Sequence, residues 1–206
     1  MSSGPRQQSP THCRADSETL HSMRLTMRRL RLKTVWLIVI PFFWFAAPTP
    51  TLLSVGSLLA VSGLWIRGWS AGTIHKDQEV TTTGPYAFTR NPLYLGSFFI
   101  GVGVSLAGGH WVWPVLFLTF YALIYSRTMT GEARHLTDLF PDAYGEYAAN
   151  VPFFLPRLTP WRGGSAGGEG QEGFRWAQYS RNKEWEASVG VVAAFVALGA
   201  KVLSGA

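Results

Sequence analysis

Residues 84–96 combine side chains that could hold a charged ligand with backbone breaks that could shape a pocket. They read Gly-Pro-Tyr-Ala-Phe-Thr-Arg-Asn-Pro-Leu-Tyr-Leu-Gly and lie between apolar segments. The first glycine tolerates a positive φ, and the proline after it fixes φ near −65°. Pro92 disfavours a helical conformation at Asn91, so we expect a turn that passes into a helix near Leu93. Aromatic and cationic side chains at the mouth of a membrane segment indicate a binding site.

A second group of candidate residues follows the next apolar stretch. Glu132 is the first carboxylate after Glu79, and a carboxylate near a membrane surface can hold a cationic group. Arg127 and His135 flank it and are further candidate residues of a site. His135 or Glu132 could also remove a proton if the substrate were an amine.

The composition is that of a membrane protein. Hydrophobic residues make up 47% of the chain and charged residues only 15%, whereas about 25% charged is usual in soluble domains. The net charge of +6 could indicate nucleic acid, but the positive charges lie in short loops beside apolar runs, which favours lipid head groups instead. The single cysteine, Cys13, excludes a disulfide framework and a thiolate metal site. We expect membrane lipids as partners, and neither nucleic acid nor a metal.

Two long runs without formal charge, residues 34–66 and 91–126, predict two helical hairpins. A single helix over the second run would be about 54 Å long, while a bilayer core is about 30 Å thick. We therefore expect turns at Pro48–Pro50 and at residues 108–110, and a fifth span near the C-terminus. The first run also fits a signal peptide, but a second apolar run follows at once. Small residues suited to close helix packing occur in two of the spans: Gly96, Gly101, Gly103 and Gly190.

The domain organisation follows from these spans. We expect a disordered tail over residues 1–22, a transmembrane core over 23–161 and a glycine-rich linker over 162–173. Residues 174–206 would form a juxtamembrane helix and the last span. Within the core, the expected segments are spans over 34–47, 51–66, 93–108 and 111–126, cytoplasmic helices over 131–150 broken at Pro141, and an extended proline-rich stretch over 151–161.

The distribution of basic residues predicts the topology. Lysine and arginine precede the first span and lie within residues 67–90 and 127–183, whereas the opposite turns carry neither. The positive-inside rule then places the N-terminus, residues 84–96 and the polar segment after Arg127 on the cytoplasmic side. We expect an all-α integral membrane bundle of about five transmembrane helices, with a cytoplasmic cofactor pocket.

The pattern Gly-Pro-Tyr-x-x-x-Arg-Asn-Pro-x-Tyr-x-Gly resembles the cofactor motif of the isoprenylcysteine carboxyl methyltransferase and phospholipid methyltransferase superfamily. The usual motif has histidine where this chain has Asn91. Downstream, Glu-Ala-Arg-His-Leu at 132–136, Tyr-Gly-Glu-Tyr at 144–147 and the Val-Pro and Leu-Pro pairs that follow are similar to the Glu-Glu-x-x-Leu, Tyr-x-x-Tyr, Val-Pro and Leu-Pro series of that family. The resemblance covers residues 81–160. Gly131 replaces the first glutamate of the family's pair, so only the second, which is the cofactor contact in the family, remains as Glu132.

The resemblance implies an enzyme that uses S-adenosyl-L-methionine as methyl donor. It implies that Glu132 pairs with the donor's ammonium or ribose hydroxyls, that Arg90 binds its carboxylate and that tyrosine rings attract its sulfonium. The cofactor-binding residues implied are Tyr86, Arg90, Asn91, Pro92, Leu93, Tyr94 and Glu132.

The resemblance also places Arg127 near the family's substrate-side arginine, and Arg127 and His135 are the substrate-side candidates. The acceptor implied is lipid-like or small and apolar, and the carboxylate of an isoprenylcysteine-type substrate comes first. The alternatives are a phospholipid amine or a small thiol, then an NADPH-dependent sterol-type reductase with a similar motif, and then a non-catalytic membrane protein.

Overall fold

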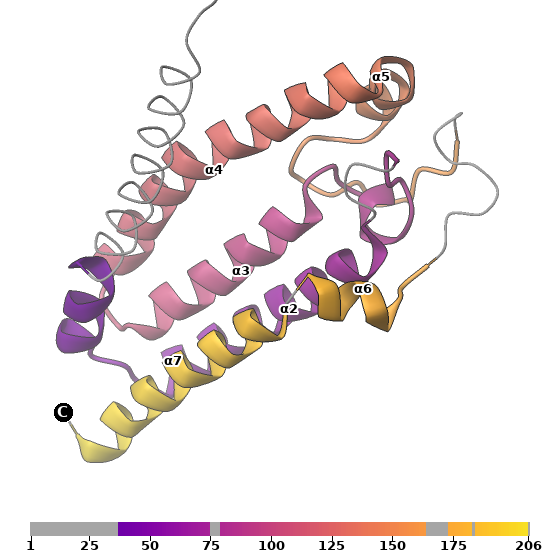
Figure 1. Ribbon diagram of the computed structural model, residues 1–206. Helices are drawn as coiled ribbons and strands as arrows, with labels where there is room; N and C mark the ends of the chain where they lie inside the picture. The colour runs from indigo at the N-terminus through magenta and orange to yellow at the C-terminus, as the bar shows by residue number, and fades with distance from the viewer. Residues whose placement is uncertain (1–36, 75–78, 164–172, 183, 206) are drawn as a thin grey trace, which may run out of the picture. The chain divides into compact units, whose positions relative to one another are not determined.

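The computed structural model describes residues 37–74, 79–163, 173–182 and 184–205, and every regular element within these ranges is a helix (Figure 1). The predicted tail over residues 1–22 lies outside them, as does most of the predicted glycine-rich linker. The chain divides into two units, one up to Phe45 and one from Ala46 onward. The first contributes a helix over residues 37–45. The second contains the candidate site.

Helices of the second unit account for most of its length. They are α2 (Pro50–Thr73), the 3-10 helix η1 (Gly84–Ala87), α3 (Pro92–Ala107), α4 (Val112–Leu139), α5 (Pro141–Asn150), α6 (Trp176–Arg181) and α7 (Trp185–Ser204). Three of them, α2, α4 and α7, are long and apolar enough to cross a membrane, and α3 is a shorter apolar helix. The prediction of an all-α membrane bundle is therefore confirmed, while the number of crossings stays a prediction.

Two of the helices are longer than predicted. Helix α2 does not end at residue 66 but continues to Thr73, because its first charged residue, Arg67, has partly buried partners and does not have to leave the helix. Helix α4 continues past residue 126 to Leu139, so the fourth span and the first predicted cytoplasmic helix are one rod of about 42 Å. The predicted break at Pro141 is where α5 begins. Leu139, the last residue of α4, is exposed.

Glycines bring α2 and α3 into backbone contact. A Cβ added at Gly63 would lie 2.5 Å from the carbonyl oxygen of Gly96, and one added at Gly56 would lie 2.4 Å from that of Gly103. The prediction that Gly96 and Gly103 serve helix packing is thus confirmed. Gly101 faces the ring of Phe117 in α4 instead.

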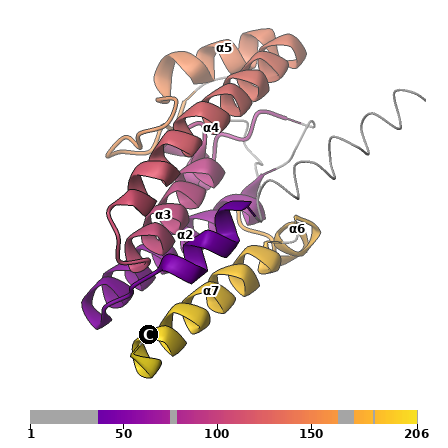
Figure 2. The ribbon, with the colours of Figure 1, turned by 90° about the vertical axis from the view of Figure 1, so that its left-hand side faces the viewer.

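The prediction for Gly190 is wrong, because no other part of the described residues lies within 4 Å of where its Cβ would be. Its helix, α7, lies beside α2 (Figures 1 and 2).

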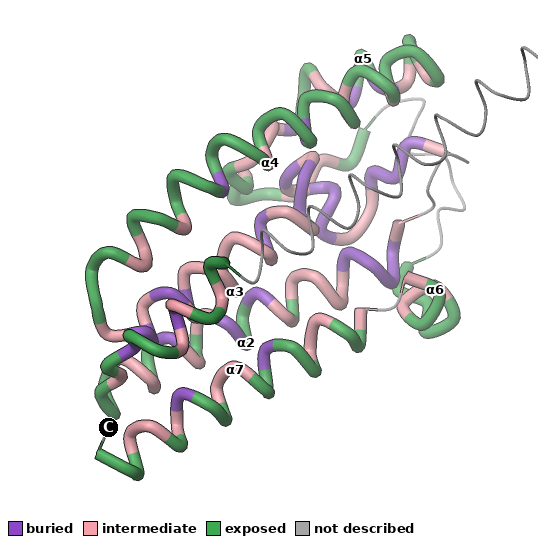
Figure 3. The backbone as a smooth tube through the Cα atoms, turned by 60° about the vertical axis from the view of Figure 1, so that its left-hand side comes forward, coloured by how far each residue is buried: buried purple, intermediate pink, exposed green. Residues whose placement is uncertain are grey.

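The outer faces of these helices are apolar. Large hydrophobic side chains such as Leu58, Leu116, Leu123 and Val192 are exposed, and α4 is exposed along most of its length (Figure 3). A soluble protein of this size rarely exposes so much apolar surface. Together with the long apolar helices, this identifies an integral membrane protein.

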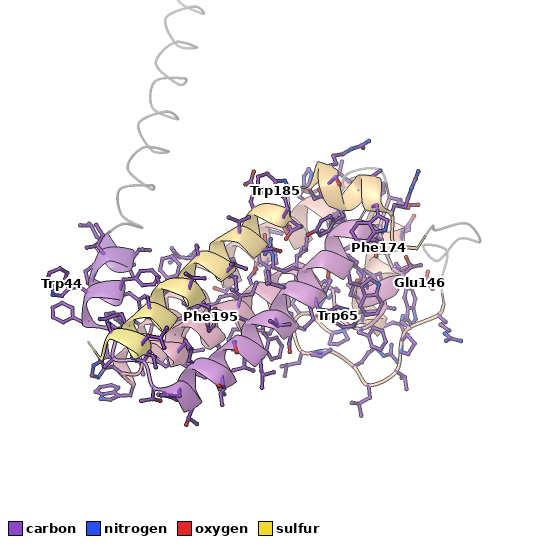
Figure 4. The ribbon with its side chains drawn as sticks, turned by 90° about the horizontal axis from the view of Figure 1, so that it is seen from below. Trp44, Trp65, Glu146, Phe174, Trp185 and Phe195 are labelled. Carbon is purple, nitrogen blue, oxygen red and sulfur yellow. The ribbon has the colours of Figure 1, made fainter. Side chains whose placement is uncertain are left out.

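The C-terminal end of α2 is completed by residues more than one hundred positions later. The carbonyl oxygen of Gly72 accepts from the Arg175 amide at 2.8 Å, that of Ile74 accepts from Gln178 Nε2 at 2.6 Å, and that of Ala71 accepts from Asn182 Nδ2 at 2.8 Å. The ring of Phe174 (Figure 4) fills the space that a side chain at Gly72 would need. These bonds satisfy carbonyl groups that a helix end leaves without intrahelical partners.

Candidate functional site

The local structure of residues 84–96 follows the predicted turn chemistry. Gly84 has φ +58° and opens η1, a conformation that costs a glycine little. Asn91 is non-helical, with φ −126° and ψ 52°, and α3 begins at Pro92. This segment therefore places a buried tyrosine, Tyr86, in η1 and a second tyrosine, Tyr94, in the first turn of α3.

The proline-rich residues 151–161 run alongside this loop without forming a helix, as predicted. Side chains of the loop bind its backbone, since Asn91 Nδ2 donates to Phe153 O at 2.8 Å and Thr89 Oγ1 donates to Phe154 O at 2.9 Å. Backbone bonds run in both directions, from Arg90 N to Pro152 O, from Arg157 N to Phe88 O and from Trp161 N to Ala87 O. Two segments far apart in the sequence thereby form one wall.

The predicted partners from α3 and α4 meet. Tyr94 Oη donates to Glu132 Oε1 at 2.7 Å. The Tyr94 ring packs edge-to-face on that of Tyr125, with centroids 5.5 Å apart, and its carbonyl accepts from Tyr121 Oη at 2.8 Å. A tyrosine ring and a carboxylate are therefore held together at one end of the apolar helices, a combination suited to a cationic group.

Two polar atoms of the loop are buried without a hydrogen-bond partner among the described residues, Tyr86 Oη and Arg90 Nε. The Arg90 guanidinium lies 5.1 Å from the centre of the Phe153 ring. Burial raises the pKa of Tyr86 well above its usual range, and Tyr147, Glu132 and Glu184 raise it further. Tyr86 is therefore a neutral donor. A buried polar group without a hydrogen-bond partner lowers the stability of the fold by about 1–3 kcal/mol. Two such groups in one loop are therefore candidates for hydrogen bonds to a ligand.

Tyr144 and Tyr147 of α5 lie behind this loop. They form a buried cluster with Val80 and Val151, and Tyr147 Oη donates to Tyr86 O at 2.7 Å. Their role is thus to pack and position the loop.

The predicted substrate-side residues are exposed on α4. With about 100° between successive residues of a helix, Arg127 lies about 140° around the axis from Glu132, and His135 lies about 60° from it. Of the two, only His135 shares the side of α4 that carries Glu132.

A hollow of about 420 Å³ lies beside η1, and its lining includes none of the predicted cofactor residues. It is formed by Trp69, Thr82, Thr83, Gly84, Ala87, Phe88, Pro160, Trp161, Arg162 and Gly163.

Sequence reasoning missed an ion pair next to the site. Arg67 of α2 binds Glu184, at the start of α7, through two hydrogen bonds, Nε to Oε2 at 2.9 Å and Nη2 to Oε1 at 2.8 Å. Its Nη1 donates to Ser97 Oγ and, at 3.5 Å, to Leu93 O. The available signal was the position of Arg67 directly after a long uncharged run. Nothing distinguished Glu184 from other charges in its polar segment.

Comparisons with known proteins agree with the sequence pattern. The sequence profile of the phospholipid methyltransferase family matches residues 34–143. The cobalt-zinc-cadmium resistance protein CzcN of Cupriavidus metallidurans is 34% identical over 177 residues, which cover 76% of this chain and 76% of that protein. The nickel-cobalt-cadmium resistance protein NccN of Alcaligenes xylosoxydans xylosoxydans is 32% identical over 120 residues, 58% of this chain and 55% of that protein.

A further relative is the protein-S-isoprenylcysteine O-methyltransferase of Schizosaccharomyces pombe, which is 31% identical over 111 residues, 52% of this chain and 47% of that protein. The chain thus spans about three quarters of the first relative and about half of the other two. No solved structure matches the chain.

Proposed function

This chain belongs to the phospholipid methyltransferase family, and we propose that it transfers a methyl group from S-adenosylmethionine to a lipid-like or small apolar acceptor at the membrane surface. The family makes it a membrane methyltransferase, which favours methyl transfer over a sterol-type reductase or a non-catalytic scaffold. The donor, the acceptor and the residues that bind them are the content of the proposal.

The observation that carries the proposal is the set of polar groups around the loop. Tyr86 Oη and Arg90 Nε are buried and lack hydrogen-bond partners among the described residues, and Glu132 Oε1 accepts a hydrogen bond from Tyr94 Oη at 2.7 Å. S-adenosylmethionine carries a sulfonium, an ammonium and a carboxylate. The residues present fit these groups in number and in charge.

Each residue has a defined role in this proposal. Glu132 would accept hydrogen bonds from the ammonium or the ribose hydroxyls, and Arg90 would bind the carboxylate. The face of the Tyr94 ring would attract the sulfonium. The hydrogen bond from Tyr94 Oη to Glu132 would keep these two groups in a fixed relation. Asn91, Pro92 and Leu93 would shape the wall between them, and Tyr86 would donate a further hydrogen bond.

When bound, S-adenosylmethionine supplies an electrophilic methyl group whose transfer destroys a positive charge. Residues 151–161, packed along the loop, would exclude water on that side, and a site with little water favours the loss of charge once the reactants are aligned.

We propose the carboxylate of an isoprenylcysteine-type compound as the leading acceptor. A carboxylate is already ionised at neutral pH, so the protein needs no base to activate it. The name of the relative from Schizosaccharomyces pombe supports this choice. A phospholipid amine is the second candidate, supported by the name of the family, and it would require His135 or Glu132 to remove a proton. The acceptor would enter from the lipid, and the site would face the cytoplasm by the positive-inside rule.

The donor is tested by isothermal titration of the purified protein with S-adenosylhomocysteine. We expect binding, and at least ~10-fold weaker binding in Glu132→Ala and Arg90→Ala, because each loses a charge-assisted hydrogen bond. Glu186→Ala and Arg181→Ala, two exposed positions, serve as matched controls. Wild-type protein that binds no S-adenosylhomocysteine, or a Glu132→Ala variant that binds it as well as the controls do, would contradict the proposal.

The acceptor is tested with radiolabelled donor and membranes that contain the protein. A prenylated cysteine and an ethanolamine phospholipid are offered side by side, and the lipid extract is separated. Label in a base-labile ester on the prenylated cysteine supports the carboxylate, and label on the phospholipid amine supports the second candidate.

A further inference from the structure

Arg67 connects three helices at the end of the bundle that carries the site. Its guanidinium binds Glu184 of α7 through Nε and Nη2, at 2.9 and 2.8 Å. The remaining nitrogen, Nη1, donates to Ser97 Oγ and to Leu93 O in the first two turns of α3. Ser97 Oγ in turn donates to Leu93 O at 2.9 Å. The Leu93 carbonyl therefore receives bonds from two side chains, directly before Tyr94.

The pair is well enclosed, since the side chains of Arg67 and Glu184 are only 24% and 10% exposed. The last glycine of the loop pattern makes room for it. A Cβ added at Gly96 would lie 2.6 Å from Arg67 Cγ and 3.0 Å from Arg67 N. The arginine stem thus lies directly on the backbone of α3, and its head is held on the other side by Glu184.

We propose that Arg67 is a positioning residue, oriented by Glu184, that fixes the first turn of α3 in the place from which Tyr94 reaches Glu132. The inference rests on the proposed function in so far as the Tyr94–Glu132 pair binds the methyl donor. It assigns a part in donor binding to α2 and α7, neither of which contributes a residue to the loop pattern.

The alternative is that the ion pair only ties α2 to α7. The two roles differ in what they require of residue 67. A tie needs opposite charges at 67 and 184, in either order. Positioning needs a donor at 67 that reaches Leu93 O and Ser97 Oγ while its other nitrogens remain bound, which the planar guanidinium allows and neither lysine nor a carboxylate does.

The deciding experiment compares four variants: Arg67→Lys, Ser97→Ala, Glu184→Gln and the exchange Arg67→Glu with Glu184→Arg. Arg181→Lys and Glu186→Gln are matched controls at exposed positions. Three quantities are measured: thermal unfolding in detergent, affinity for S-adenosylhomocysteine, and hydrogen–deuterium exchange of peptides over residues 93–98. The exchange measurement needs no ligand.

If Arg67 positions the turn, the charge-swapped double variant Arg67→Glu/Glu184→Arg unfolds near the wild-type temperature but binds S-adenosylhomocysteine ~10-fold more weakly. Its hydrogen–deuterium exchange over residues 93–98 is also faster. Arg67→Lys and Ser97→Ala show the same two effects, and the controls show neither. A charge-swapped double variant with wild-type affinity and wild-type hydrogen–deuterium exchange would overturn the inference, because an ion pair between α2 and α7 would then suffice.

If the charge-swapped double variant does not fold, Ser97→Ala decides in its place, since that variant keeps the ion pair. Wild-type affinity for S-adenosylhomocysteine together with wild-type hydrogen–deuterium exchange over residues 93–98 in Ser97→Ala would then overturn the inference. If wild-type protein binds no S-adenosylhomocysteine, the proposed function fails, and exchange over residues 93–98 alone decides whether Arg67 fixes the turn.

Discussion

A backbone contact between α2 and α3 makes Gly96 a position where one added methyl group should be costly. A Cβ there would lie 2.7 Å from Gly63 O, about 0.7 Å short of the 3.4 Å at which ordinary contact begins. Because this neighbour is a backbone atom, no rotamer change relieves the overlap, and the helices must separate. A gap of this size loses about a quarter to a half of the dispersion attraction along the interface.

For Gly96→Ala we therefore expect a loss of about 1–3 kcal/mol from overpacking, reduced by the gain of about 1 kcal/mol in helix propensity. The same separation would move Arg67 Nη1 away from Leu93 O, where the bond of 3.5 Å is already at the limit of hydrogen-bond range. Affinity for S-adenosylhomocysteine should fall along with stability.

The matched control is Gly190→Ala, which makes the same change in another apolar helix, at a position where a Cβ would meet none of the described residues within 4 Å. It should gain up to about 1 kcal/mol from helix propensity. Thermal unfolding of both variants in the same detergent measures the difference. A Gly96→Ala variant as stable as Gly190→Ala would refute the packing argument.

Three further predictions concern the loop. Tyr86→Phe removes a buried hydroxyl that has no hydrogen-bond partner among the described residues. The variant should therefore have a higher unfolding temperature without ligand and weaker binding of S-adenosylhomocysteine. A variant less stable than wild type would show that the hydroxyl is hydrogen-bonded in solution. Burial raises the pKa of Tyr86 and of Tyr147, so above about pH 10 the folded protein keeps protons that the unfolded chain loses, and its stability falls. Melting temperatures measured from pH 7 to 11 should therefore stay constant up to about pH 10 and then decrease. The decrease should be less steep in Tyr86→Phe. Asn91→Leu leaves Phe153 O without its side-chain hydrogen bond and should lower the free energy of unfolding by about 1–3 kcal/mol. Asn91→His can donate the same bond and should still bind S-adenosylhomocysteine. Equal losses in both variants, measured by unfolding and calorimetry, would contradict this prediction.

Local chemistry explains which parts of the structure the sequence could predict. The positive φ of Gly84, the helix start at Pro92 and the break at Pro141 each depend on one residue and its neighbours. The uncharged runs located the apolar helices for the same reason. The meeting of Tyr94 with Glu132 was implied by the family resemblance, because no local signal relates residues on different helices.

The end of α2 could not be predicted because distant contacts decide it. Arg67 stays inside α2 since Glu184, 117 positions later, binds it. Gly190 shows the converse error. A small residue in an apolar helix predicts a packing surface only if another helix lies against it, and the described residues place none there.

The bonds from Arg175, Gln178 and Asn182 to the end of α2 have a consequence for biosynthesis. Those three residues leave the ribosome more than one hundred positions after the helix that they complete, and the same holds for the counter-ion of Arg67. Until Glu184 has been synthesised, the nascent chain carries open carbonyl groups and an uncompensated cation at the membrane surface. A ribosome stalled before residue 173 should therefore hold a chain that is inserted, protease-sensitive and inactive.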